Sequence, residues 1–221
     1  MIAVRGLSVV FGHTVALDSI DVEIAPGITG LFGPNASGKS TLLRVLAGLL
    51  TPNAGTVEIR GRAIDARDER ARRAIGYVGH ESGLYGRLTV RENLELFARL
   101  YGALPDRVEA LLDALVLGER ADVAVRDLSA GYKRRASVAR ALLHEPDVLL
   151  LDEPYANLDD EAAALVSSTV REWHSAERAA VIATHGAKTV KAFADAGVIL
   201  KRGRVVVAGS YRRGDQAEAT P

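Results

Sequence analysis

The feature that most constrains the fold is an uninterrupted match to the phosphate-loop pattern G-x-x-x-x-G-K-[ST]. Its residues are Gly33, Pro34, Asn35, Ala36, Ser37, Gly38, Lys39, Ser40 and Thr41. Apolar residues 28–32 precede it as a strand, and residues 42–47 continue it as a helix. The glycines let backbone N–H groups face a phosphate, and the helix N-terminus adds a positive dipole end. This order predicts a nucleotide-binding core rather than a Gly/Ser-rich helix cap.

Two side chains of this stretch suit a nucleoside triphosphate bound with a magnesium ion. Lys39 supplies a mobile cation for the β- and γ-phosphates, and Ser40 offers a hydroxyl group to Mg²⁺. We therefore expect both residues to contact the ligand, together with the loop that carries them.

Composition fits one domain and excludes several functions. The 221 residues contain 28 Lys and Arg against 28 Asp and Glu, so no overall positive field favours nucleic acid, and we expect no nucleic-acid partner. The absence of cysteine excludes disulfides, thiolate metal sites and a cysteine nucleophile. Neither a secretory signal nor an apolar run of membrane-spanning length is found, so a membrane role would require a partner chain.

The start of the chain is predicted to form a β layer beside the nucleotide core. Apolar residues between positions 4 and 24 alternate or cluster as short strands, with turn sequences at 12–13 and 26–27. Residues 56–59 add another strand, followed by Gly61. We expect these strands to be antiparallel.

The middle of the chain is predicted to form a helical lobe at about residues 86–145. Thr89 and Glu92 have the spacing of a capping box at a helix start. Four apolar residues then repeat on one helix face: Leu94, Phe97, Ala98 and Tyr101. Pro105 begins a second helical stretch, and we expect the lobe to be inserted between two strands of the core.

After the lobe the pattern returns to alternating strands and helices. Residues 147–151 read as a strand covered on both faces, a helix starts near Asp159, and residues 180–184 form the next strand. A hairpin is expected over residues 198–207. The fold class is therefore α/β, with a P-loop (RecA-like) core and a mostly parallel sheet. We expect one domain over residues 1–209 and a polar tail over 210–221.

Polar residues follow the two buried strands. Asp152 is placed to hold Mg²⁺ through a water molecule, and Glu153 to accept a proton from, or to orient, the water that attacks a γ-phosphate. Successive residues at a strand end point in different directions, so adjacent carboxylates can have different roles. The alternative is an acidic helix cap.

Further motifs resemble those of the ATP-binding cassette (ABC) ATPases. Residues 128–132, Leu-Ser-Ala-Gly-Tyr, resemble the signature motif, and residues 149–154 follow at the family's usual interval. Residues 156–159 resemble the D-loop, and residues 75–80 resemble the lead into the Q-loop. His185 matches the switch histidine, and Phe11 the aromatic residue that stacks on adenine. The resemblance extends from residue 1 to about 208.

The resemblance implies an ATP hydrolase that uses Mg²⁺ and pairs head-to-tail with a second ATPase chain. Ser129 and Gly131, at the start of a helix, would then form an anion site for the partner's ATP. Asp159 would lie at the dimer seam, and His185 would contact the γ-phosphate. Read alone, Ser129 and Asp159 are ordinary helix caps, His185 is structural, and Phe11 is a core residue.

The sequence departs from the family pattern at two positions. His80, followed by Glu81, stands where the Q-loop usually has glutamine, and Tyr132 ends the signature in place of glutamine. A neutral imidazole nitrogen can accept from water or bind a metal, but it cannot both donate and accept as an amide does. We keep His80 as an expected contact to Mg²⁺ and the attacking water, for which Glu81 is the substitute.

We expect an ATP-hydrolysing subunit that drives separate membrane-spanning chains from the cytoplasmic face of the membrane, and its motifs favour an exporter. The Gly79-His80 pair and the Leu-Ser-Ala-Gly signature also resemble the ATPases of bacterial cytochrome c maturation, described as haem exporters. The loop of residues 80–89 is the candidate contact surface for a membrane partner. The alternatives are a soluble ABC ATPase of iron–sulfur cluster assembly and the ATPase of a drug or other exporter.

Overall fold

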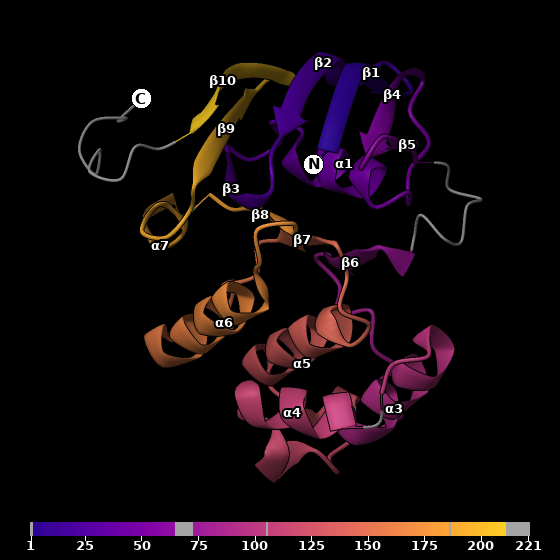
Figure 1. Ribbon diagram of the computed structural model, residues 1–221, viewed down its shortest axis with the longest axis vertical. Helices are drawn as coiled ribbons and strands as arrows, with labels where there is room; N and C mark the ends of the chain where they lie inside the picture. The colour runs from indigo at the N-terminus through magenta and orange to yellow at the C-terminus, as the bar shows by residue number, and fades with distance from the viewer. Residues whose placement is uncertain (1, 65–72, 105, 186, 211–221) are drawn as a thin grey trace.

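The computed structural model describes residues 2–64, 73–104, 106–185 and 187–210 (Figure 1). Pro105, the expected first residue of a helix, lies outside the described residues, as do residues 211–221 of the tail expected at 210–221. Within the described ranges, none of the helices is both long and apolar enough to cross a bilayer.

A six-stranded sheet forms the centre of the molecule, in the order β10-β9-β3-β8-β7-β6. Its strands are β3 (Gly27–Phe32), β6 (Ile75–Val78), β7 (Val148–Asp152), β8 (Ala179–Ala183), β9 (Ala196–Lys201) and β10 (Arg204–Ser210). All neighbours are parallel except β9 and β10, which form the expected hairpin. The expected tail boundary is wrong by one residue, because Ser210 pairs with Ala196 and ends β10.

A second, antiparallel sheet has the order β2-β1-β4-β5 and confirms the expected β layer. Its strands are β1 (Ile2–Phe11), β2 (Thr14–Ile24), β4 (Ala54–Ile59) and β5 (Arg62–Ala63). The expected short strands are wrong, because β1 and β2 each run continuously through shifts of register. Gly6 and Ser19 have positive φ (55° and 47°) within these strands, as residues at β-bulges do. A bulge interrupts the alternation of apolar and polar residues in the sequence, although the strand itself continues.

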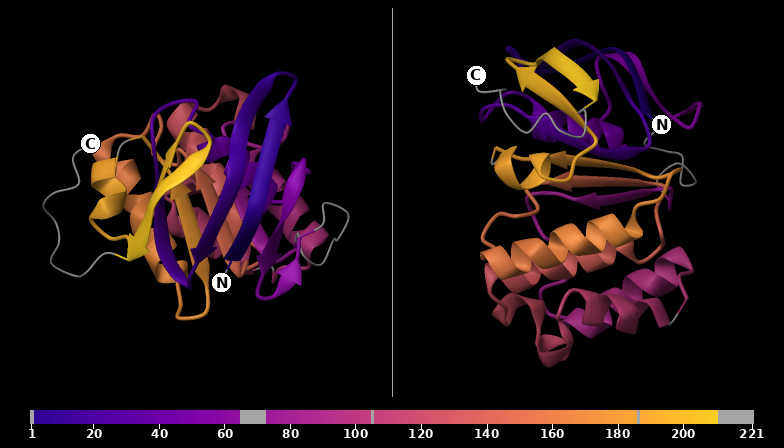
Figure 2. Two further views of the ribbon diagram at one scale, coloured as in Figure 1. Left: turned by 90° about the horizontal axis from the view of Figure 1, so that it is seen from above. Right: turned by 60° about the vertical axis from the view of Figure 1, so that its left-hand side comes forward.

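The sheets and helices stack in layers (Figures 1 and 2). α1 (Lys39–Leu46) lies between the two sheets, whereas α5 (Ala130–Leu142) and α6 (Asp160–Trp173) cover the other face of the six-stranded sheet. Along β7, Leu149 and Leu151 join the helical core while Val148 and Leu150 join the core around α1. The central sheet is thus covered on both faces, as its apolar strands predict.

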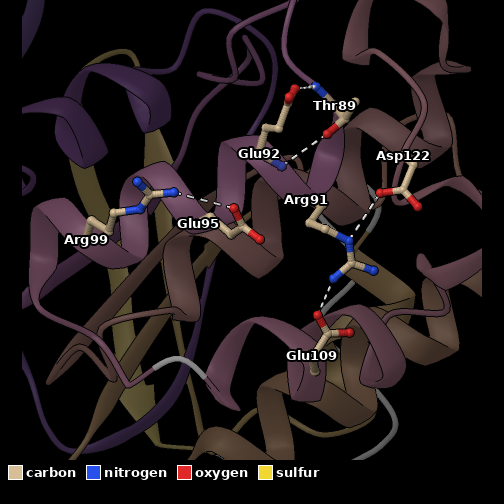
Figure 3. A network of polar contacts seen from close by, with 7 residues as sticks. All are labelled: Thr89, Arg91, Glu92, Glu95, Arg99, Glu109 and Asp122. Carbon is tan, nitrogen blue, oxygen red and sulfur yellow. Dashed lines mark hydrogen bonds and ion pairs between the residues drawn. The ribbon is translucent and has the colours of Figure 1, made fainter.

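The helical lobe is inserted between β6 and β7, as predicted. It contains α3 (Val90–Tyr101), α4 (Asp106–Ala114), the 3₁₀ turns at Gly118–Arg120 and Val125–Asp127, and α5. The capping box is confirmed: the Thr89 hydroxyl accepts from Glu92 N at 3.1 Å, and the Glu92 carboxylate accepts from Thr89 N at 2.8 Å (Figure 3). Arg91 joins Glu109 of α4 to Asp122, so one side chain links α3 to two other parts of the lobe.

Candidate functional site

The phosphate loop connects β3 to α1. β3 is buried along its whole length, and two loop glycines have positive φ, Gly33 at 147° and Gly38 at 106°. A Cβ atom at Gly33 would lie 2.2 Å from the carbonyl oxygen of Leu200, and one at Gly38 would lie 2.7 Å from that of Ala16. Both positions therefore require glycine for backbone conformation and for space.

The first turn of α1 and Lys39 fit the predicted triphosphate. Gly38 is the N-cap and, among the described residues, no side chain caps this end, so its N–H groups suit an anion. The Lys39 ammonium donates to the carbonyl oxygens of Gly33 at 2.8 Å and Pro34 at 3.1 Å. The cation is thus held against the loop that would receive the phosphates.

Asp152 ends β7 with only 4% of its surface exposed. Burial raises the pKa of its carboxyl group above 3.8; a hydrogen bond with Ser40 opposes this rise, the charge of Glu153 adds to it, and the charges of Lys39 and Arg134 oppose it. A buried carboxylate paired with a hydroxyl group is a suitable set of oxygen ligands for Mg²⁺.

Glu153 points toward the end of the neighbouring strand rather than toward Ser40. Its Oε2 accepts from Thr184 Oγ1 at 3.1 Å, and its Oε1 accepts from the backbone N–H of His185 at 2.8 Å. His185 Nδ1 lies 2.9 Å from the same Oε1. The adjacent carboxylates therefore face different partners, as the sequence predicts, because β7 and β8 end side by side.

The contact with Glu153 fixes the tautomer of His185. A carboxylate only accepts, so Nδ1 must carry the hydrogen, and Nε2 is then the acceptor in the neutral ring. Thr184 was not among the expected site residues, although it is 3% exposed and holds Glu153. Its place between a buried strand and His185 marks it as a residue at a strand end, but does not specify the contact with Glu153.

Ser129 is the N-cap of α5, and its Oγ accepts from Tyr132 N at 3.4 Å. A Cβ atom at Gly131 would lie 3.3 Å from the carbonyl oxygen of Asn157, a close but not forbidden approach. α5 and α1 cover opposite faces of the six-stranded sheet (Figure 1). The ordinary capping role of Ser129 is therefore present, and a role toward a partner's phosphate stays a prediction.

Three further expected residues occupy the surface. Phe11 is 49% exposed at the end of β1, so it is not a core residue. Asp159 caps α6, with Oδ1 accepting from Ala162 N at 2.8 Å. His80 is exposed, and its backbone carbonyl lies 3.4 Å from an Arg134 nitrogen.

The expected magnesium contacts do not form a preassembled metal centre. Across the described ranges, no three His, Asp or Glu side chains gather closely enough to hold a metal ion. This agrees with a site in which Ser40 and Asp152 supply only part of the ligand set and phosphate oxygens the rest. The contact of His80 with Mg²⁺ stays a prediction.

The fold and these geometries define a P-loop nucleotide-binding domain in which two strand-end carboxylates stand beside the phosphate loop. A family model described as ABC transporter matches residues 17–156, and the chain belongs to this family. It is an ABC-type ATPase domain, the ATP-binding subunit of a transporter. This confirms the family expected from the signature motif.

Known proteins of two kinds are similar over nearly the whole chain. The Nod factor export ATP-binding protein I of Cupriavidus metallidurans is 36% identical, over 95% of this chain and 71% of the relative. The protein of the same name in Ralstonia nicotianae is 34% identical, over 95% of this chain and 67% of the relative. The structure resembles a dimeric post-hydrolysis state of the ATP-binding cassette MJ0796 bound to ADP and Pi, with a TM-score of 0.88, 26% identity and coverage of 96% of this chain and 99% of that one.

Proposed function

We propose that this chain is the ATP-hydrolysing subunit of an ABC exporter, acting at the cytoplasmic face of a membrane with separate membrane-spanning chains. The arrangement of Glu153 carries the proposal: its carboxylate is fixed by Thr184 and His185 one residue beyond Asp152. The names of the two similar relatives support export, since both are export ATP-binding proteins.

The phosphate side of the reaction is assigned to three residues. Lys39 would leave the loop carbonyls to bind phosphate oxygens, and Ser40 and Asp152 would hold Mg²⁺. When bound, Mg²⁺ supplies positive charge to the phosphate oxygens. Phe11, exposed at the end of β1, would stack on the adenine ring.

Glu153 would orient the attacking water and accept its proton. Its hydrogen bonds with Thr184 and His185 fix the carboxylate, so little reorganisation is needed when the water binds. His185 would keep its bond to Glu153 through Nδ1, which leaves Nε2 on the opposite side of the ring to face the γ-phosphate and its surrounding groups. His80 would complete the site from the segment that follows β6.

A second copy or a related ATPase chain would complete each ATP site. Ser129 and Gly131 lie at the start of α5, in a layer that the central sheet separates from α1 (Figure 1). An anion site there suits the nucleotide of a partner, with Asp159 at the seam. The similarity to a dimeric cassette supports this arrangement.

The loop of residues 80–89 is proposed to contact a cytoplasmic segment of the membrane-spanning chain. The ring of Tyr85 in this loop stacks on Phe97, with 6.1 Å between centroids. Phe97 lines a surface hollow of about 450 Å³, which Leu49 and Leu100 border with more than half of their surfaces exposed. The loop therefore lies beside a largely apolar hollow, which suits the apolar face of a short helix.

The first test is the Glu153→Gln variant, in which the amide keeps the shape of the side chain but loses the base. We expect at least about a hundredfold lower kcat, with ATP still bound, measured by phosphate release and by nucleotide binding. Glu161→Gln, on the exposed first turn of α6, is the control and should hydrolyse ATP normally. Near-native kcat in Glu153→Gln would exclude the base assignment.

The same variant identifies the partners. Tagged Glu153→Gln would be purified from its native membranes in mild detergent with Mg-ATP, and we expect multispanning chains to co-purify. Cytochrome-maturation proteins among them would select the narrower hypothesis of haem export. Recovery of only soluble partners would favour an assembly ATPase and contradict the transporter role.

A further inference from the structure

Side chains along one face of α5 and just beyond its end bond backbone carbonyls of β6 and of the segment after it. His144 Nε2 lies 3.2 Å from the carbonyl oxygen of Ile75. Arg140 donates to Tyr77 O at 2.7 Å and also to Gly83 O at 3.2 Å. The contacts therefore begin on the strand and continue beyond its last residue.

The same face of α5 also bonds backbone carbonyls of residues 79–82, the part of the segment after β6 that contains His80. Arg134, 8% exposed, donates to the carbonyl oxygen of Gly79 at 2.7 Å and lies 3.4 Å from that of His80. The Ser137 hydroxyl lies 2.9 Å from the carbonyl oxygen of Ser82. Successive turns of one helix thus fix the backbone of residues 79–83.

Direct packing supports the same connection. A Cβ atom at Gly76 would lie 2.3 Å from the carbonyl oxygen of Ala141, so the backbones of β6 and α5 are in contact. Residues 79–83 are therefore attached to α5, and a shift of that helix displaces them. The N-cap of α5 is Ser129, the residue proposed to meet a partner's ATP.

Arg134 also lies within the electrostatic field of the catalytic carboxylates. Burial lowers the pKa of its guanidinium, while the charges of Asp152 and Glu153 raise it. Burial is the larger effect, so the pKa is lowered overall, but an arginine side chain remains charged in proteins. It donates its hydrogen bonds from a planar, fixed fork. A cation at this place would be costly to bury without those carbonyl oxygens and carboxylates.

We propose that Arg134 is a positioning residue for ATP hydrolysis, which fixes the backbone of Gly79 and His80 and makes that segment follow α5. This inference rests on the proposed role of His80 at the attacking water. Arg134 touches neither ATP nor water in this scheme; it acts through the residue whose carbonyl it holds.

Arg135 provides a matched control on the same helix. It is also 8% exposed, and it donates to two backbone carbonyls, Leu115 O at 2.7 Å and Val116 O at 2.8 Å. Both of its partners lie inside the helical lobe, not on the segment after β6. Loss of either arginine removes two contacts with backbone carbonyls, and Arg135 also lies over the ring of Tyr132, so its loss is at least as disruptive to packing. Only loss of Arg134 releases His80.

The experiment compares the steady-state kinetics of purified Arg134→Gln and Arg135→Gln. We expect Arg134→Gln to lower kcat about 10- to 100-fold with KM for ATP within about twofold, because misplacement of a reacting group affects the chemical step. Arg135→Gln should keep kcat near native. Arg134→Lys, which retains the charge without the fork, should be intermediate and serves if Arg134→Gln does not fold.

A double-mutant cycle with His80→Ala tests whether Arg134 acts through His80. In the His80→Ala background, Arg134→Gln should change kcat by less than about twofold, because coupled residues are not additive. Native kcat in Arg134→Gln, an equal loss in Arg135→Gln, or full additivity with His80→Ala would each overturn the inference. Native activity of His80→Ala alone would instead overturn the proposed role of His80, on which the inference depends.

Discussion

Asp152 shows that a buried carboxyl group suited to bind Mg²⁺ can also lower the stability of the fold. Its folded pKa is raised above 3.8, mainly by burial, so between the unfolded and the folded pKa the native protein binds more protons than the unfolded chain. The free energy of unfolding therefore falls as the pH rises through that window. At neutral pH, in the absence of a bound cation, the ionised Asp152 destabilises the fold.

Replacement of Asp152 by Asn should therefore stabilise the nucleotide-free protein while removing a magnesium ligand. We expect its Tm at pH 7 to rise by about 2–4 °C for each kcal/mol gained. The gain should shrink as the pH is lowered toward 4, because the native carboxyl group then becomes neutral as well. Thermal unfolding at several pH values without Mg²⁺ measures this.

The exposed Asp160, in the first turn of α6, is the control for this substitution. Asp160→Asn should not raise the Tm, since a carboxylate near a helix N-terminus is favourable. A Tm of Asp152→Asn equal to or below that of the native protein at pH 7 would contradict the destabilising role of the charge.

Some site residues could be predicted from the sequence, because their roles depend on local order. The phosphate loop follows a strand and precedes a helix, and Asp152 follows a buried strand, so neighbours in sequence suffice to place them. Thr184 could not be selected in this way. Its contact with Glu153 depends on the pairing of β7 with β8, which a pattern of apolar residues does not specify.

Helix α3 shows the same distinction at the scale of one element. Thr89 and Glu92 close the predicted capping box, whereas the bridge from Arg91 to Glu109 and Asp122 depends on how α3 packs (Figure 3). The short helix α7 (Ala187–Lys191) was not predicted, because five residues are too few for a helical repeat to be recognised.

Thr89→Ala is expected to lower the free energy of unfolding by about 1 kcal/mol, because it leaves the N–H group of Glu92 without its side-chain acceptor. Urea denaturation at neutral pH measures the change. The control is Glu95→Gln in the same helix, whose contact with Arg99 is solvent-exposed and should contribute less than about 0.5 kcal/mol. An equal loss of unfolding free energy in both variants would show that the capping box stabilises the protein no more than an exposed ion pair does.

At the scale of the whole molecule, the sequence predicted the layers and the inserted lobe, since strand and helix periodicities alternate along the chain. It did not predict the continuous β1 and β2, because bulges interrupt their alternation. Nor did it predict the attachment of α5 to the segment after β6. Arg134 and Arg140 look like surface residues in the sequence, and only the fold shows that their partners are backbone carbonyls.

A mixing experiment tests the proposed head-to-tail dimer. Lys39→Ala and Ser129→Arg should each be inactive alone, because one loses the phosphate loop lysine and the other blocks the signature site. In a mixed dimer one site combines both defects and the other has neither. An equal mixture should therefore recover about a quarter of native ATPase activity if the chains exchange freely.

A mixture that recovers no activity would contradict this arrangement, provided that chain exchange is verified with differently tagged subunits. A mixture of Lys39→Ala with itself under two tags is the control and should remain inactive.

The bonds from Arg140 of α5 and from His144 to β6 also affect the tendency of the central sheet to pair with strands of other molecules. Among the described residues, β6 lies at one edge of the central sheet and pairs with β7 alone. Such a strand usually offers a row of unpaired carbonyls that a foreign strand can extend. Here the carbonyls of Ile75 and Tyr77 are already bonded by His144 and Arg140. A foreign strand would therefore compete with His144 and with Arg140 of α5 for these two acceptors, which disfavours strand-to-strand association at this edge.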